Sequence, residues 1–108
     1  MQDELLVPPS KRTAEYQRSH LLAEQAHYRA RLADAERHIV ESERRVSRHL
    51  QRIGTRQASG LDTAETERRL LVTQAGLAEW QAYREQLLRA IEQMNDRSSS
   101  SALAKTAS

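Results

Sequence analysis

Four histidines are the residues whose types and spacing come closest to a chemical site in this chain. His20, His27, His38 and His49 are separated by seven, eleven and eleven residues. On one helix they form a stripe, but steps of roughly 10 to 17 Å along the axis prevent two of them from sharing a metal. Glu24 and His27, with His20 below them, resemble half of a carboxylate-bridged bundle site. We expect histidines at the edge of a buried face and no metal; the alternative is a pH-sensitive interface.

A row of arginines is the second candidate, because guanidinium groups bind phosphates. The row consists of Arg37, Arg44, Arg45, Arg48 and Arg52, and Arg56 continues it. Glu41 lies four residues from both Arg37 and Arg45, a spacing that allows ion pairs along one helix. No aromatic residue interrupts the row and no nucleic-acid motif is present. We expect a solvated, internally paired face, and we keep nucleic-acid contact as the alternative.

Residues for catalysis are missing from the pattern. The chain has no cysteine, which excludes a thiol nucleophile and a thiolate metal site. It has no glycine-rich phosphate loop and no nucleophile with a base at a usable spacing. We therefore expect a protein that is not an enzyme, with no catalytic, cofactor-binding or metal-binding residues.

Composition predicts an all-α protein. Hydrophobic residues make up 38% of the 108 residues and aromatic residues only 4%, so one copy cannot build a thick core. Charged residues reach 30%, while glycine, proline and β-branched residues are scarce, which favours helix over sheet.

The formal charge of +2 allows a nucleic-acid partner without requiring one. No run of about twenty apolar residues exists and the acidic start is too short for a secretory signal, so we expect a cytoplasmic protein with no membrane partner.

The first helix is expected at about 11–58, after a flexible tag at 1–10 that ends in Pro8 and Pro9. Its apolar positions fall within an arc of about 60°, which is narrow enough to pack against one helix. They are Leu21, Tyr28, Leu32, Ala35, Ile39, Val46, Leu50 and Ile53. This spacing predicts coiled-coil-like packing.

A short turn at about 59–62 is expected to reverse the chain. Gly60 suits the left-handed position that ends a helix, and Asp62 or Thr63 can cap the next one. The second helix is expected at about 62–95, followed by a disordered Ser-rich tail at 97–108. Its apolar face includes Leu70, Leu77, Trp80, Leu87, Leu88, Ile91 and Met94, and a second row contains Leu71, Ala75, Ala78 and Ala82. Two apolar rows indicate two neighbouring helices.

The expected assembly is a long antiparallel two-helix hairpin that forms a dimeric four-helix bundle or binds another protein. The seam residues for self-association are Leu32, Ile39, Val46, Leu50, Ile53, Leu70, Leu77, Trp80, Leu87 and Ile91. The first helix is expected to be longer by about a dozen residues, and Tyr16, Leu21 and Leu22 in its overhang form a candidate docking site for a partner. Arg84, within the apolar arc, is expected either to extend its charged end to solvent or to pair across the helices with Asp34 or Glu36.

Several segments resemble a known group of proteins. They are Ala35-Glu36-Arg37-His38-Ile39, Glu43-Arg44-Arg45-Val46, Gly60-Leu61-Asp62-Thr63, Leu70-Leu71, and Arg84 with Leu87 and Leu88. Over residues 32–91 the chain is similar to short uncharacterised helical-hairpin proteins of alphaproteobacteria, although Leu61 and the long lead from Met1 to Ala30 depart from that group. It has a weaker likeness to the hairpin stalk proteins of flagellar and type III export ATPases. The first resemblance implies a hairpin and a bacterial origin, and neither implies an activity.

These observations predict an interaction or adaptor protein without chemistry of its own. One alternative is a small nucleic-acid-associated or regulatory protein that uses the arginine row. The other is an export stalk or chaperone-like protein.

Overall fold

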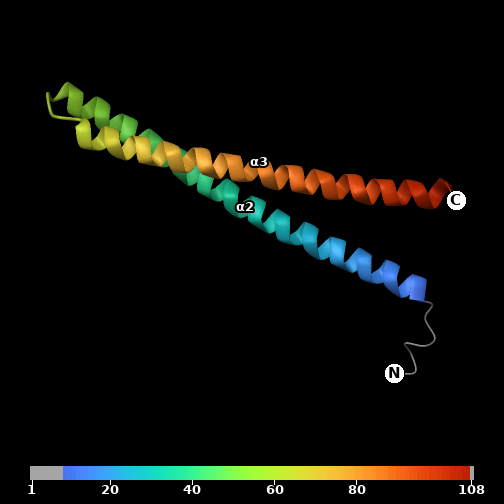
Figure 1. Ribbon diagram of the computed structural model, residues 1–108. Coiled ribbons are helices and arrows are strands. Elements are labelled where there is room, and N and C mark those ends of the chain that lie inside the picture. Colours follow the sequence, from blue (N-terminus) through green and yellow to red (C-terminus); the bar gives the residue numbers. More distant parts are fainter. Residues whose placement is uncertain (1–8, 108) are drawn as a thin grey trace, which may run out of the picture.

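Two long helices make up the protein in a computed structural model, which describes the chain over residues 9–107 and its side chains over residues 13–97. Helix α2 (Pro9–Ala58) has 50 residues and helix α3 (Ala64–Ala107) has 44. They pack antiparallel in an elongated hairpin that measures 80 × 34 × 14 Å (Figure 1). The described residues contain no strand. The expected all-α hairpin is confirmed.

The end of α2 is determined by Gly60. Its φ of 69° is the left-handed conformation that only glycine adopts without strain. The Leu61 N–H donates to the Arg56 carbonyl at 2.8 Å, and the Gly60 N–H donates to the Gln57 carbonyl at 3.1 Å. These are the two hydrogen bonds of a Schellman motif, which satisfies the last carbonyls of the helix. The predicted role of Gly60 is therefore confirmed.

The start of α3 is capped by Asp62, one of the two residues that were predicted as caps. Its Oδ1 accepts from the Ala64 N–H at 3.1 Å, and the Thr63 carbonyl accepts the first helical bond from Glu67 at 2.9 Å. Glu65 and Glu67 lie in the first turn, where negative charge is favourable. The turn is tied further by the Arg56 Nε, which donates to the Asp62 carbonyl at 2.8 Å.

A seven-residue repeat relates the positions at which the two helices face each other. On α2 the covered positions alternate by four and three residues: 28, 32, 35, 39, 42, 46, 49, 53 and 56. On α3 they are 66, 70, 73, 77, 80, 84, 87, 91 and 94. We call these positions the seam. Contacts from Gln25 to Asn95, from His38 to Trp80 and from His49 to Thr73 set their antiparallel register.

The helix bounds differ from the expected ones at both open ends. Helix α2 begins at Pro9, since proline suits the first helical position. Helix α3 continues to Ala107, whereas the sequence analysis ends it near Asn95 and expects a disordered tail from residue 97. Good helix formers between residues 102 and 105 favour this continuation. The two helices consequently differ by six residues, 50 against 44, instead of about a dozen, so α2 has no long overhang.

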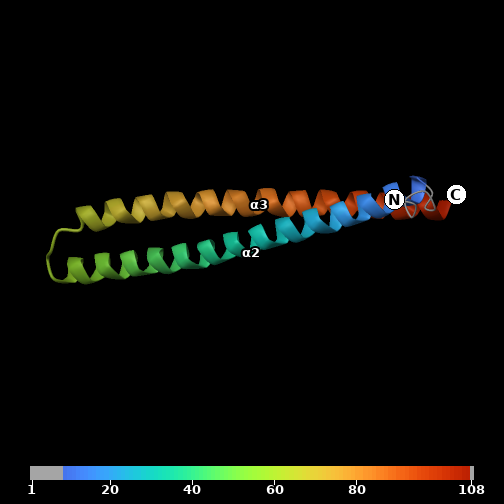
Figure 2. The same ribbon diagram turned by 90° about the horizontal axis from the view of Figure 1, so that it is seen from below.

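The helices cross at an angle. In Figure 1 they overlap near the turn and separate toward the termini, whereas in the view turned by 90° they are apart near the turn and overlap at the other end (Figure 2). Each helix therefore shields its partner along one narrow line. Within residues 9–107 neither helix contains a segment long and apolar enough to cross a membrane.

Candidate interaction surface

The seam buries very few apolar side chains. Those that are buried are Ala35, Ile39, Leu87 and Met94, and Met94 is the largest side chain that is fully buried. The other predicted seam residues, with one exception, are half-buried: Leu32, Val46, Ile53, Leu70, Leu77, Trp80 and Ile91. The exception is Leu50, which is 53% exposed. The seam position next to it is occupied by His49, seven residues after Ser42.

Polar residues take many seam positions in the half of the hairpin near the turn. Thr66 is the buried polar residue there, and Ser42, His49 and Thr73 are half-buried. The Thr73 Oγ1 and the His49 Nε2 form a hydrogen bond of 3.3 Å between the helices. His49 was expected at the edge of a buried face, but Ser42, Thr66 and Thr73 were not anticipated, because only apolar residues had been assigned to the seam. The repeat of seven that connects Ala35, Ser42 and His49 was the available signal.

Exposed apolar side chains gather on one side of the hairpin. Leu22, Val40, Leu50 and Leu71 are exposed. The last three directly follow the seam positions Ile39, His49 and Leu70, and Leu22 follows half-buried Leu21, which continues the repeat seven residues before Tyr28. One step along a right-handed helix rotates a side chain by about 100°. In two antiparallel helices that face each other, the residues that follow a seam position on one helix and on the other therefore lie on the same side of the pair. We call this surface, defined by Leu22, Val40, Leu50 and Leu71, the apolar side.

Residues that directly precede a seam position lie on the opposite side, which we call the charged side. It is defined by Arg31, Arg45, Arg52, Arg69 and Tyr83. The Arg31 Nη1 donates to the Tyr83 hydroxyl at 3.2 Å, which confirms that these positions of the two helices meet. Near the turn Arg52 and Arg69 line one hollow from the two helices.

Two arginines of the predicted row form ion pairs within α2. The Arg37 Nη2 lies 2.9 Å from the Asp34 Oδ1, and the Arg45 Nη2 lies 2.9 Å from the Glu41 Oε1. The expected internal pairing is confirmed for these two, although the partner of Arg37 is Asp34 and not Glu41.

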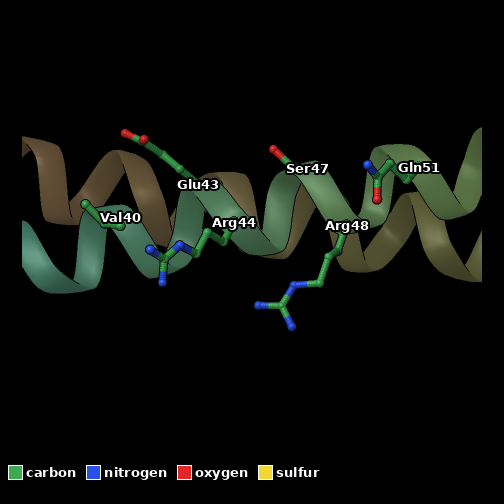
Figure 3. A pocket seen from close by; sticks show the side chains of 6 residues that line it. All are labelled: Val40, Glu43, Arg44, Ser47, Arg48 and Gln51. Carbon is green, nitrogen blue, oxygen red and sulfur yellow. The ribbon is translucent and has the colours of Figure 1, made fainter.

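The other three arginines of the row stand unpaired. Arg44, Arg48 and Arg52 have no carboxylate within ion-pair distance among the described side chains. In Figure 3 Arg44 and Arg48 extend outward from a shallow depression that is lined by α2 alone. Val40 and Ser47 form its opposite edge (Figure 3). With no wall from α3, this depression is a helix surface and not a ligand cavity.

The expected pair between the helices at Arg84 is confirmed. The Arg84 Nε lies 3.5 Å from the Glu36 Oε1, and its Nη1 lies 3.5 Å from the Glu85 Oε1. Arg84 occupies a seam position, and the fully buried Ala35 next to Glu36 leaves room for the long side chain.

The histidine stripe divides into two pairs of residues. His20 lies 3.7 Å from Glu24, and exposed His27 contacts Tyr28 on its own helix. His38 and His49 instead contact α3, through Trp80 and Thr73. Among the described residues no three side chains of His, Cys, Asp or Glu converge to hold a metal. Of the four histidines, only His38 and His49 therefore take part in the contact between the two helices.

The predicted docking residues near the start of α2 differ in exposure. Tyr16 and Leu22 are exposed, while Leu21 is half-buried. Tyr16 stacks on His20 of its own helix, with ring centroids 6.2 Å apart. Leu22 belongs to the apolar side, so it is continuous with exposed residues farther along the hairpin.

Charge is unevenly distributed along the rod. Residues 44–75, around the turn, contain seven arginines and three acids. Residues 13–43 and 76–97, toward the open end, contain seven arginines and ten acids. The turn half is therefore positive, whereas the open half is neutral once Lys11, Arg12 and Lys105 of the helix ends are counted.

No protein-family model matches this chain, and neither curated proteins nor solved structures include a match. The properties of the hairpin itself carry the functional argument.

Proposed function

We propose that this protein is a non-enzymatic interaction protein that associates with a second copy of itself through coiled-coil-like packing into a four-helix bundle. The observation that carries the proposal is the imbalance between buried and exposed apolar side chains. Among the side chains of residues 13–97, four apolar ones are buried, whereas seven large ones are exposed: Tyr16, Leu22, Val40, Leu50, Leu61, Leu71 and Val72.

Energetics support association. Covering a large apolar side chain contributes about 1.5 to 3 kcal/mol, and a symmetric dimer covers each position twice. A pair of helices 14 Å thick has no further layer with which to cover these residues. A second hairpin supplies that layer, and the rod shape leaves long surfaces free for other proteins, as in an adaptor.

Sedimentation equilibrium of the full chain at micromolar concentration tests the proposal. The expected mass is twice the 12.4 kDa of one copy. A folded species with the mass of one copy across this concentration range would contradict self-association. Helical circular dichroism in the same samples distinguishes such a folded monomer from an unfolded chain.

A second candidate function is nucleic-acid binding, which is favoured by the three unpaired arginines. Arg44, Arg48 and Arg52 follow one another at four-residue steps, about 6 Å of helix each. Replacing all three with glutamate is expected to abolish a steeply salt-dependent retention on DNA if this function holds. The matched control replaces Arg37 and Arg45, which already have acidic partners. If the wild-type protein is not retained on DNA at physiological salt, this candidate is eliminated.

A further inference from the structure

We propose that five arginines near the turn form a surface that binds the sugar-phosphate backbone of a nucleic-acid duplex without reading its bases. They are Arg45, Arg48, Arg52, Arg56 and Arg69, and we call them the arginine surface. The inference rests on nucleic-acid binding, the second candidate function, and specifies the residues that make contact and the kind of nucleic acid.

The arginine surface belongs to a part of the hairpin that is poor in acidic residues on both helices. Residues 44–61 contain five arginines and no acid, and residues 68–78 contain two arginines and no acid. The hydrogen bond between His49 and Thr73 places these two segments side by side. Every cation in them is an arginine, whose permanent charge and planar fork of donors match phosphate oxygens. This part of the hairpin therefore attracts anions.

The five arginines lie on one side of the hairpin. Four of them directly precede a seam position, so they belong to the charged side, and half-buried Arg56 occupies the last seam position of α2. Figure 3 shows Arg48 and Ser47 extending toward opposite edges of α2. Arg44 neither precedes nor follows a seam position, so it lies on the outer face of α2. It is therefore not part of the arginine surface.

Two adjoining hollows run along the arginine surface. The one near the turn has a volume of about 290 Å³ and is lined from both helices by Arg52, Arg56 and Arg69, together with Asp62, Glu65 and Thr66. The next has a volume of about 450 Å³ and runs along α2, where Arg45, Arg48 and Arg52 line it. Arg52 lines both hollows, so the arginines follow one another in a continuous strip. An open strip fits an extended chain of phosphates, whereas a single small ligand needs an enclosed pocket.

The acidic residues beside the arginine surface already have partners. The Glu65 Oε1 lies 2.8 Å from the Arg69 Nη2. The Asp62 Oδ1 accepts a hydrogen bond from the Ala64 N–H at 3.1 Å. Glu41 lies 2.9 Å from another arginine of the surface. Five arginines against these three acids leave the surface positive.

Arg48 and Arg52 are the members with the most donors to offer. Neither has a carboxylate within ion-pair distance among the described side chains, and both are exposed. Each guanidinium carries five N–H donors and can bind a phosphate through two parallel hydrogen bonds. The two residues are separated by four positions, which is about 6 Å along the helix. We expect them to contact neighbouring phosphates.

The lining of the hollows favours a duplex over a single strand. Proteins that bind single strands stack the bases on aromatic side chains. No tryptophan or tyrosine among the described side chains lines either hollow, and the ring of His49 is hydrogen-bonded to Thr73. Contacts to phosphates alone carry no sequence information. The expected ligand is therefore a duplex of any sequence.

Two arginines one turn apart allow a matched test of the surface. Arg44 and Arg48 are both exposed and unpaired, but only Arg48 belongs to the arginine surface. Arg48→Ala and Arg52→Ala are each expected to weaken binding to a duplex by about three- to tenfold and to reduce its salt dependence by about one released ion. Arg44→Ala is expected to weaken binding by less than about twofold. Equal losses from Arg44→Ala and Arg48→Ala would overturn the assignment of the surface.

Fluorescence anisotropy with labelled nucleic acids tests the ligand. Two duplexes of unrelated sequence are expected to bind with the same affinity, and a single strand of equal length is expected to bind more weakly. Vesicles that contain an anionic phospholipid are expected not to displace the duplex. Tighter binding of the single strand, a strong preference for one sequence, or displacement by the vesicles would each overturn the duplex backbone as the ligand.

The variants separate failure of this inference from failure of nucleic-acid binding. Duplex binding that is unchanged in Arg48→Ala and Arg52→Ala keeps the second candidate function and rejects this surface. A wild-type protein that binds no nucleic acid at physiological salt rejects both. Because positions 48 and 52 are exposed, circular dichroism and sedimentation are expected to show unchanged helicity and mass in both variants.

Discussion

The imidazole of His38 lies flat against the indole of Trp80, with ring centroids 4.1 Å apart and ring planes 6° apart. The Asp34 Oδ2 lies 3.6 Å from the His38 Nε2, and the Tyr83 ring meets the indole edge-on with centroids 6.0 Å apart. This stack joins α2 to α3 near the middle of the rod. A polar ring thus takes the place of an apolar side chain in covering the indole.

His38→Ala is expected to destabilise the hairpin by about 0.5 to 1.5 kcal/mol, because it removes an aromatic pair between the helices. It also uncovers the indole, so quenching of tryptophan fluorescence by acrylamide should increase. His27→Ala is the control, since exposed His27 contacts only Tyr28 on its own helix among the described ring contacts. Equal quenching in the wild type and in His38→Ala would show that the stack does not persist in solution.

Gly60→Ala is expected to destabilise the protein by about 1 to 2 kcal/mol, because its φ of 69° strains any residue with a Cβ. Gly54→Ala is expected to have the opposite effect and to stabilise by about 0.5 to 1 kcal/mol, since no atom lies within 4 Å of the added Cβ in the single hairpin. Chemical denaturation of the two variants measures both signs. A stabilising Gly60→Ala would mean that the Schellman turn is not formed.

Leu87→Ala is expected to be strongly destabilising, by about 2 to 5 kcal/mol, because Leu87 is one of the few buried apolar side chains. The loss is a large part of the stability of so thin a protein. Val72→Ala, at an exposed position on the same helix, should change the free energy of unfolding by less than about 0.5 kcal/mol. Thermal unfolding followed by circular dichroism measures both variants. Equal melting temperatures of Leu87→Ala and Val72→Ala would contradict the burial of Leu87 between the helices.

The hydrogen bond between His49 and Thr73 predicts non-additive substitutions. Thr73→Val alone leaves the half-buried His49 without this partner and should cost about 1 kcal/mol. Combining it with His49→Leu replaces both polar groups by apolar ones and is expected to restore or raise stability. A double-mutant cycle measured by urea denaturation gives the coupling. Additive effects would mean that this hydrogen bond does not contribute.

Some contacts of the candidate interaction surface could be predicted from the sequence and others could not. A pair of Arg84 with Asp34 or Glu36 was one of two alternatives, beside a side chain that extends to solvent, and Glu36 is the partner in the structure. The three unpaired arginines were not predicted, since pairing depends on rotamers as well as on spacing. The α3 part of the apolar side was anticipated by the second apolar row that contains Leu71, whereas the α2 part was not, because Leu50 was assigned to the seam.

The sequence alone determined the two helices and the turn between them, because these depend on interactions over a few residues. Gly60, the Asp62 cap and the absence of proline between residues 10 and 108 act within one helical turn, and no distant contact is needed to interpret them. Only the tertiary structure decided which of two adjacent residues faces the other helix, as with His49 and Leu50. A straight helix drifts by about 20° per seven residues relative to a repeat of seven, so small differences in winding accumulate along 50 residues. The packing of α3 against α2 removes that ambiguity, and with it decides which side chains remain exposed together.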